Sequence, residues 1–158
     1  MKVYPALRDA SGLRFGVVVS LFNHLISASL LEACEQELRE RGAAAEDVHV
    51  AWVPGAYEIP LVARRLAETG RYAALVTLGV VIQGATPHFD YVCRAVTDGV
   101  REAMRDTGVP IAFGVLTTRD VDQALARAGE GKGAEVARAA IEMARLLPAL
   151  SDPPKEGV

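Results

Sequence analysis

The sequence contains little cysteine and no excess of positive charge. Its two cysteines, Cys34 and Cys93, have no CxxC spacing and no histidine cluster beside them, so the sequence predicts neither a metal site nor a redox pair. We expect both to be buried apolar side chains on helices. The formal net charge is −3 and the lysines and arginines form no cluster, which argues against a nucleic-acid partner.

Long apolar runs are also missing. No run approaches the ~18 apolar residues that a membrane helix needs, and the N-terminus lacks a charged start followed by a long apolar core. We therefore expect a cytoplasmic protein with no membrane partner. The sequence does have 51% hydrophobic residues among 158 positions, which is on the apolar side for one small domain and hints at self-association.

Four apolar, β-branched runs alternate with segments of helical periodicity. The runs are apolar on both faces, which is typical of buried parallel strands, and they cover residues 15–20, 48–53, 73–82 and 111–116. Helical periodicity covers residues 27–41, 57–69, 87–107 and 134–147. This alternation predicts an α/β three-layer sandwich, with helices on both faces of a central four-stranded parallel sheet.

Residues 14–150 are predicted to form this single domain. Residues 1–13 have no helix of their own and are predicted to be an N-terminal arm, either added to a neighbouring subunit's sheet or loose. Residues 151–158, which include two adjacent prolines, are predicted to be a flexible tail. Glycine at helix C-caps and proline in a first helical turn are expected at Gly42, Gly70, Gly108 and Pro60.

The segments that follow the predicted strands carry the candidate chemistry, because open parallel sheets bind ligands at the carboxyl ends of their strands. Phe22 and Asn23 follow the first strand, and offer an aromatic ring and a side chain that hydrogen-bonds in two directions. After the second strand, Tyr57 and Glu58 bring a ring and a carboxylate to a helix start. Residues 83–88 follow the third strand.

The third segment has the pattern of an anion site. Gly84 and Ala85 allow close approach of a ligand to the backbone, Thr86 is a good N-cap, and Pro87 suits the first helical position. Free N–H groups there would point at an anion such as phosphate. His88 falls in the first turn, where the helix dipole disfavours imidazolium, so the neutral ring is a candidate general base.

Structural explanations compete with each of these interpretations. A Thr-Pro helix start is usually a cap alone, and a lone histidine is more often structural than catalytic. Phe22 and Tyr57 could equally be core or subunit-contact residues, and Glu58 could simply favour the helix dipole. Phe113 lies within the fourth strand, so a core position is its default. What favours a functional role is that Phe22, Tyr57, Glu58 and residues 83–88 all lie just after the ends of predicted strands.

A glycine-rich break precedes the last helix. Arg127 and Lys132 flank this break. Charges on such a loop are usually solvated, but a guanidinium beside a glycine-rich turn also suits phosphate recognition.

Several long segments resemble the lumazine synthase family. Residues 51–60, 79–92 and 113–118 are similar to its signature segments, and the resemblance extends in order over residues 13–147, with Phe22, Asn23 and Arg127 in matching positions. It implies a flavodoxin-like sandwich assembled into homopentamers, with each active site between neighbouring subunits. It also implies a transferase that needs no metal or organic cofactor.

The implied reaction condenses 5-amino-6-(D-ribitylamino)uracil with 3,4-dihydroxy-2-butanone 4-phosphate to 6,7-dimethyl-8-ribityllumazine, phosphate and water. Matching positions place His88 as the proton-transfer group. Substrate binding is implied for Phe22, Asn23, Ala56, Tyr57, Glu58, Val80, Val81, Ile82, Phe113 and Lys132, and phosphate binding for Gly84, Ala85, Thr86 and Arg127. Of these, Phe113, Arg127 and Lys132 would come from the adjacent subunit.

The sequence departs from the family pattern at two places. Gln83 stands where arginine is common, and the loop at residues 128–133 is about three residues shorter than usual, with one lysine fewer near Lys132. A short loop is associated with a shell of sixty subunits, in which riboflavin synthase is a possible partner. The alternatives are a non-catalytic flavin- or lumazine-binding shell protein, and a phospho-receiver or flavodoxin. The first strand ends in neither the paired acids of a receiver nor the Ser/Thr-rich loop of a flavodoxin.

Overall fold

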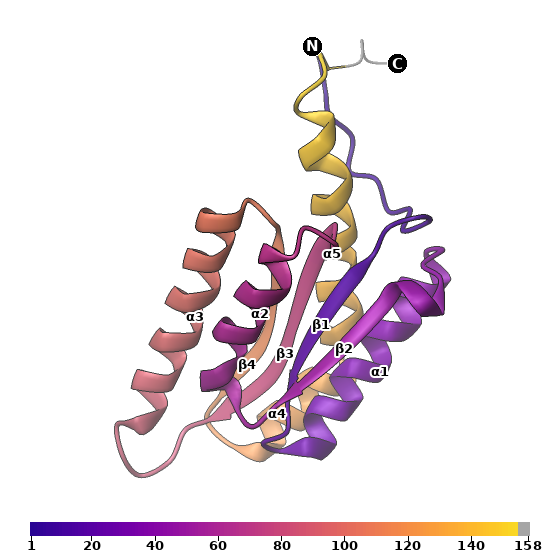
Figure 1. The fold of residues 1–158 in the computed structure, drawn as a ribbon. Helices are drawn as coiled ribbons and strands as arrows, with labels where there is room; N and C mark the ends of the chain where they lie inside the picture. The colour runs from indigo at the N-terminus through magenta and orange to yellow at the C-terminus, as the bar shows by residue number, and fades with distance from the viewer. Residues whose placement is uncertain (155–158) are drawn as a thin grey trace.

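The computed structural model describes residues 1–154 of the chain (Figure 1). Its centre is a parallel sheet of four strands in the order β2-β1-β3-β4. The strands are β1 (Phe15–Ser20), β2 (Val48–Val53), β3 (Ala74–Ile82) and β4 (Ile111–Thr118). β1 and β3 are buried along almost their whole length, because each has a strand on both sides and helices above and below.

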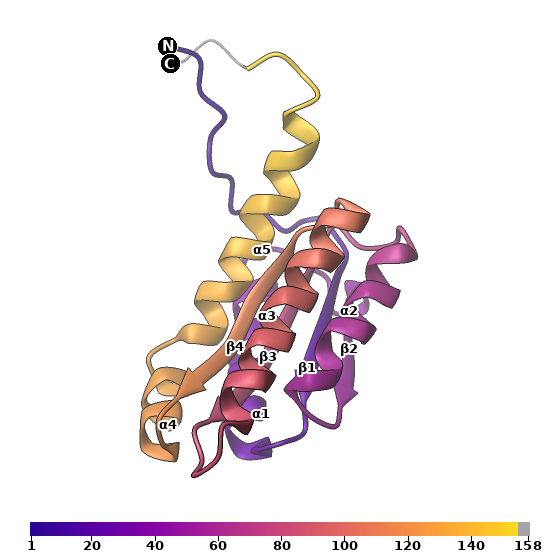
Figure 2. The same cartoon turned by 90° about the vertical axis from the view of Figure 1, so that its left-hand side faces the viewer.

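Helices cover both faces of the sheet (Figures 1 and 2). The helices are α1 (His24–Glu40), α2 (Ile59–Glu68), α3 (His88–Thr107), α4 (Val121–Gly129) and α5 (Lys132–Ala149). One apolar core lies between the sheet and α1, α4 and α5, and a second lies between the sheet and α2 and α3. The predicted three-layer α/β sandwich with a four-stranded parallel sheet is therefore confirmed.

Most predicted boundaries agree with the structure to within three residues. The largest difference is at the start of α1, which begins at His24, three residues before the predicted start. Gly42, Gly70 and Gly108 follow helix ends with positive φ, and Pro60 lies in the first turn of α2, as expected. In α3, the left-handed conformation of Gly108 ends the helix and its N–H bonds the Met104 carbonyl.

The prediction that all four strands are buried on both faces is wrong for β2. This strand is half-buried, and Trp52 within it is 40% exposed. The reason is topological: β2 pairs with β1 alone and forms one edge of the sheet. The apolar composition of β2 gives no sign of this edge position.

The two cysteines differ in burial. Cys34 on α1 is fully buried, and this burial raises the pKa of its thiol to about 12. Cys93 on α3 is only half-buried, so its predicted burial is wrong. Burial, with a contribution from the Asp90 carboxylate, still raises the pKa of the Cys93 thiol.

Helices α1 and α5 pack closely across the first core. Gly133, in the first turn of α5, lies against the Leu30 carbonyl of α1, with no space for a Cβ atom. Glu37 of α1 is 8% exposed and contacts Arg41 (Nε···Oε1 2.9 Å) and Arg138 of α5 (Nη1···Oε2 3.3 Å). Burial alone would raise the pKa of Glu37, but hydrogen bonds from these two arginines outweigh it and lower the pKa below its ordinary value.

Both described ends of the chain leave the domain on the side away from the carboxyl ends of the strands (Figures 1 and 2). The arm of residues 1–13 is fixed at Ala10, which is buried and whose N–H bonds the Arg41 carbonyl. Arg145 of α5 donates to the carbonyls of Asp9 and Ser11. Addition of the arm to a neighbouring sheet stays a prediction, and the predicted tail lies partly outside the described residues.

Candidate active site

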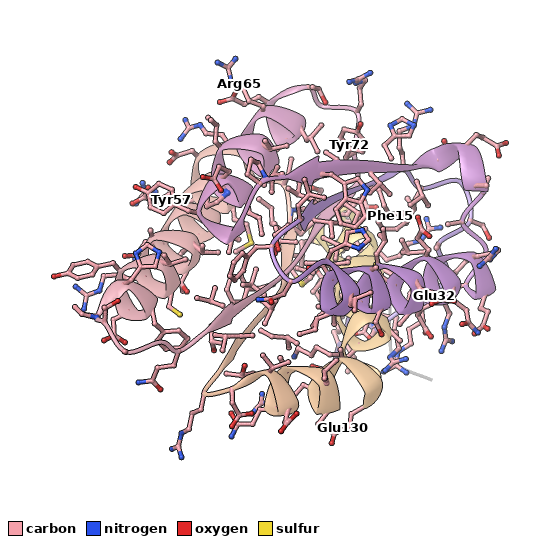
Figure 3. All side chains as sticks on the ribbon, turned by 90° about the horizontal axis from the view of Figure 1, so that it is seen from below. Phe15, Glu32, Tyr57, Arg65, Tyr72 and Glu130 are labelled. Carbon is pink, nitrogen blue, oxygen red and sulfur yellow. The ribbon has the colours of Figure 1, made fainter. Side chains whose placement is uncertain are left out.

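A cavity of about 670 Å³ opens at the edge of the sheet where the strands have their carboxyl ends. In the sheet, β2 lies on one side of β1 and β3 lies on its other side, so the strand order reverses its direction at β1. This edge therefore contains the topological switch point at which such sheets bind ligands. Figure 3 views this edge and shows Tyr57 on the side of α2 and α3. The cavity is lined by Phe22, Pro54, Gly55, Ala56, Tyr57, Glu58, Val80, Val81, Ile82, His88, Phe89, Tyr91 and Val92.

The end of β3 forms the apolar part of the cavity. Val80 and Val81 are 1% and 7% exposed, so they present small parts of a rigid, packed strand to the cavity. Phe22 and Tyr57, by contrast, are 59% and 64% exposed. Large aromatic rings left open at a cavity mouth are typical of ligand contact or of contact with another chain.

Glu58 supplies the one carboxylate among the lining residues. It lies in the 3₁₀ turn Ala56–Glu58 that leads into α2, and its Oε2 is close to Gly55. Two residues separate this turn from the end of β2, so the strand sets its position closely. Glu58 and Tyr57 are both exposed, which leaves their polar atoms accessible to a polyhydroxylated ligand.

Asn23 lies beside the cavity and is not part of its lining. It precedes α1 with φ 53° and ψ 54°, and among residues 1–154 no other non-glycine residue has a positive φ. Asparagine tolerates this left-handed conformation better than most residues. Its carbonyl accepts the N–H of Ile26 and Ser27, and its side chain forms no cap. The side-chain amide is therefore not used to cap α1.

The loop before α3 is exposed from Gln83 to Pro87. Nothing lies within 4 Å of the position that a Cβ on Gly84 would take, so this part of the loop faces open space. The prediction that Thr86 caps α3 is wrong, because the helix begins at His88 and Pro87 is its N-cap, without a side-chain bond. The early N–H groups of α3 consequently have no side-chain acceptor from this loop.

His88 is the first residue of α3, is exposed, and lines the cavity. Phe89, Tyr91 and Val92 of the same helix also line it, although the sequence alone did not single them out. Spacings of three and four residues from His88 put Tyr91 and Val92 on its side of the helix, and this signal could have identified both.

Besides Asn23 and the loop residues Gly84, Ala85 and Thr86, three more predicted residues are not part of the cavity lining. Phe113 is 38% exposed on the edge strand β4, so its default core position is wrong: no strand covers that edge. It pairs with Thr77, which lies three residues before Val80, the first lining residue of β3, or ~10 Å along the strand from the cavity. Arg127 is exposed on α4, and Lys132 bonds Glu135 at the start of α5 (2.9 Å).

Helix α4 belongs to the core on the opposite face of the sheet from α2 and α3. Figure 3 shows this separation, with Glu130 just beyond α4 on the other side of the molecule from Tyr57. Arg127 is accordingly not among the residues that line the cavity of its own chain. Within residues 1–154, no group of three or more His, Cys, Asp or Glu side chains is arranged to hold a metal ion, and no helix there has the length and apolarity to cross a membrane.

A parallel four-stranded sandwich with a ligand-sized cavity at its switch point defines a flavodoxin-like α/β protein. The sequence model of the family described as 6,7-dimethyl-8-ribityllumazine synthase matches residues 12–148, which is most of the chain. The chain belongs to this family of riboflavin biosynthesis.

Proposed function

We propose that this protein is a transferase that condenses 5-amino-6-(D-ribitylamino)uracil with 3,4-dihydroxy-2-butanone 4-phosphate to 6,7-dimethyl-8-ribityllumazine. The observation that carries the proposal is that the segments after β1 and β2, the end of β3 and the start of α3 bring aromatic, carboxylate and histidine side chains to one cavity, next to an exposed glycine loop. Family membership supports the same reaction. We further propose that it acts in the cytoplasm.

The cavity offers a different surface to each part of the two substrates. Phe22 would stack on the pyrimidine ring, over the apolar floor of Val80, Val81 and Ile82, with the backbone at Ala56 and Tyr57 beside it. Asn23 and Glu58 would hold the ribityl chain by hydrogen bonds. The exposed backbone at Gly84, Ala85 and Thr86, before the N-terminus of α3, would bind the phosphate of the second substrate.

The reaction needs orientation and proton transfer more than it needs strong catalytic groups. The primary amine attacks the ketone and loses water to form an imine, and abstraction of a proton then expels phosphate. The second amine closes the ring with loss of another water. Holding both reactants together can contribute up to ~7–11 kcal/mol, and proton transfer by His88 about 100- to 10,000-fold in rate.

A neighbouring copy would supply the phosphate-binding cation. Gln83 brings no charge to the loop, and Arg127 of the same chain lies beyond the opposite face of the sheet. We therefore propose a homopentamer in which Arg127, Phe113 and Lys132 of one chain complete the cavity of the next. We extend this to a shell of twelve pentamers with riboflavin synthase as a possible partner, because the loop before α5 is short.

The direct test is to mix the purified protein with both substrates and to follow the fluorescence of the lumazine product. We expect product formation well above a blank without protein. Folded and assembled protein that forms no product, but still binds the lumazine, would instead favour the non-catalytic shell protein.

A further inference from the structure

The lining of the cavity includes a second group with an exchangeable proton on α3, in addition to His88. Tyr91 lines the cavity and is 70% exposed, more than either Phe22 or Tyr57. Its helix neighbours Phe89 and Val92 are half-buried and pack against the core between the sheet and α2 and α3. The ring of Tyr91 is therefore not part of the core against which Phe89 and Val92 pack.

The position of Tyr91 on the helix directs it toward the phosphate loop. It stands three residues after His88, and side chains three apart on a helix are neighbours. Helical side chains also lean toward the N-terminus of their helix, so the ring of Tyr91 covers the turn that begins at His88. Residues 83–87 join directly to that turn.

The hydroxyl of Tyr91 is available for a ligand. Among residues 1–154 it forms no hydrogen bond, whereas the hydroxyls of Tyr4 and Tyr72 bond the Asp152 carbonyl and His49. A phenol hydroxyl can donate a hydrogen bond to an anionic oxygen. Gln83 and the exposed loop bring no cation, so a neutral donor on α3 would strengthen binding of a phosphate group there.

We propose that Tyr91 is a further substrate-contacting residue, whose hydroxyl donates a hydrogen bond to the phosphate-bearing substrate at the α3 wall of the cavity. This inference rests on the proposed function for the identity of that substrate. Its high exposure leaves the ring free to turn onto a bound phosphate ester. The same hydroxyl would have no role toward the second, uncharged substrate.

Steady-state kinetics of Tyr91→Phe test the proposal, because this variant keeps the ring and removes the hydroxyl. We expect the KM for the phosphate-bearing substrate to rise about 10- to 150-fold, the effect of losing a hydrogen bond to a charged group, with the KM for the amine substrate unchanged. The control Tyr4→Phe removes a hydroxyl far from the cavity and should behave as wild type. Circular dichroism and size-exclusion chromatography check that both variants fold and assemble.

Titration with inorganic phosphate separates this inference from the proposed function. If the wild-type protein forms no lumazine but binds phosphate, and Tyr91→Phe binds it about 5-fold more weakly or worse, then the reaction is wrong and the Tyr91 contact holds. Equal KM values and equal phosphate affinity in Tyr91→Phe and wild type would overturn the inference. So would an equal rise in both KM values, which would indicate a structural role.

Discussion

At the scale of single residues, His88 is the first helical residue of α3 and faces the cavity. We expect His88→Asn to slow lumazine formation about 100-fold or more without abolishing it, because orientation of the two substrates would persist when proton transfer is lost. Initial rates at saturating substrate measure this effect.

His49→Asn is the matched control for this change. The His49 ring contacts Tyr72 Oη and the Glu46 carbonyl near the start of β2, at the other end of the sheet from the cavity. It should keep nearly the full rate. Unchanged turnover in folded His88→Asn, or none that can be detected, would contradict the role of His88.

Residue positions were predictable where they depend on the strands alone. Eight predicted residues line one cavity because each lies at or just after the carboxyl end of a strand. Phe113 and Thr86 were not placed correctly, since edge exposure and the exact first residue of a helix depend on packing between elements. The family resemblance suggested an exposed role for Phe113, which the residue pattern did not.

At the scale of elements, the contact of α1 with α5 depends on Gly133. We expect Gly133→Ala to lower the free energy of unfolding by about 1–3 kcal/mol, because its Cβ would overlap the Leu30 carbonyl and the two helices would have to separate. Urea unfolding followed by circular dichroism measures the change. Alanine has a higher intrinsic helix preference than glycine, which opposes the expected loss of stability, so a measured loss would understate the effect of the overlap.

Gly129→Ala is the control at the end of α4. Nothing lies within 4 Å of the position of its Cβ and its φ is not positive, so we expect no loss of stability and a gain of up to ~1 kcal/mol. An equal loss in both variants would mean that crowding against α1 does not explain the effect at Gly133.

Glu37 ties α1 to α5 in a way that depends on pH. Its pKa is lowered in the folded protein, so its stabilising contribution is complete above the unfolded pKa of ~4.3 and is lost as the pH falls through the lower folded pKa. We expect Glu37→Gln to cost about 1–2 kcal/mol at pH 7, and the difference from wild type to shrink below about pH 4. Urea unfolding at several pH values checks this; a difference that grows on acidification would contradict it.

Elements could be predicted from periodicity because period and turn signals are local. The strand ranges for β1 and β2 were correct to the residue, whereas the edge position of β2 was not predicted. Strand order is a property of the whole sheet, and a mostly apolar strand has the same sequence pattern in the centre and at an edge.

At the scale of the whole molecule, exposed apolar side chains occur near both sheet edges, with Trp52 and Phe113 exposed in the edge strands. We expect the purified protein to scatter light as five or sixty times the 16.8 kDa chain, because the cavity would lack its cation in a monomer. Multi-angle light scattering after size exclusion distinguishes these states. A monomer with full activity would disprove the shared site.

The three-layer architecture followed from alternating patterns along the chain, but the assembly did not. An interface joins surfaces of different chains, and a single sequence carries no period that reports it. The composition hints at self-association, but the separation of Arg127 from the cavity, which needs coordinates, is what gives a second copy a role in the site.

The two described ends of the chain meet, since the Tyr4 hydroxyl donates to the Asp152 carbonyl at 3.0 Å. Chains with adjoining ends accept circular permutation, because a short linker can replace the natural break. A permuted chain opened at the exposed turn around Gly70 would therefore keep every lining residue of the cavity in its native element.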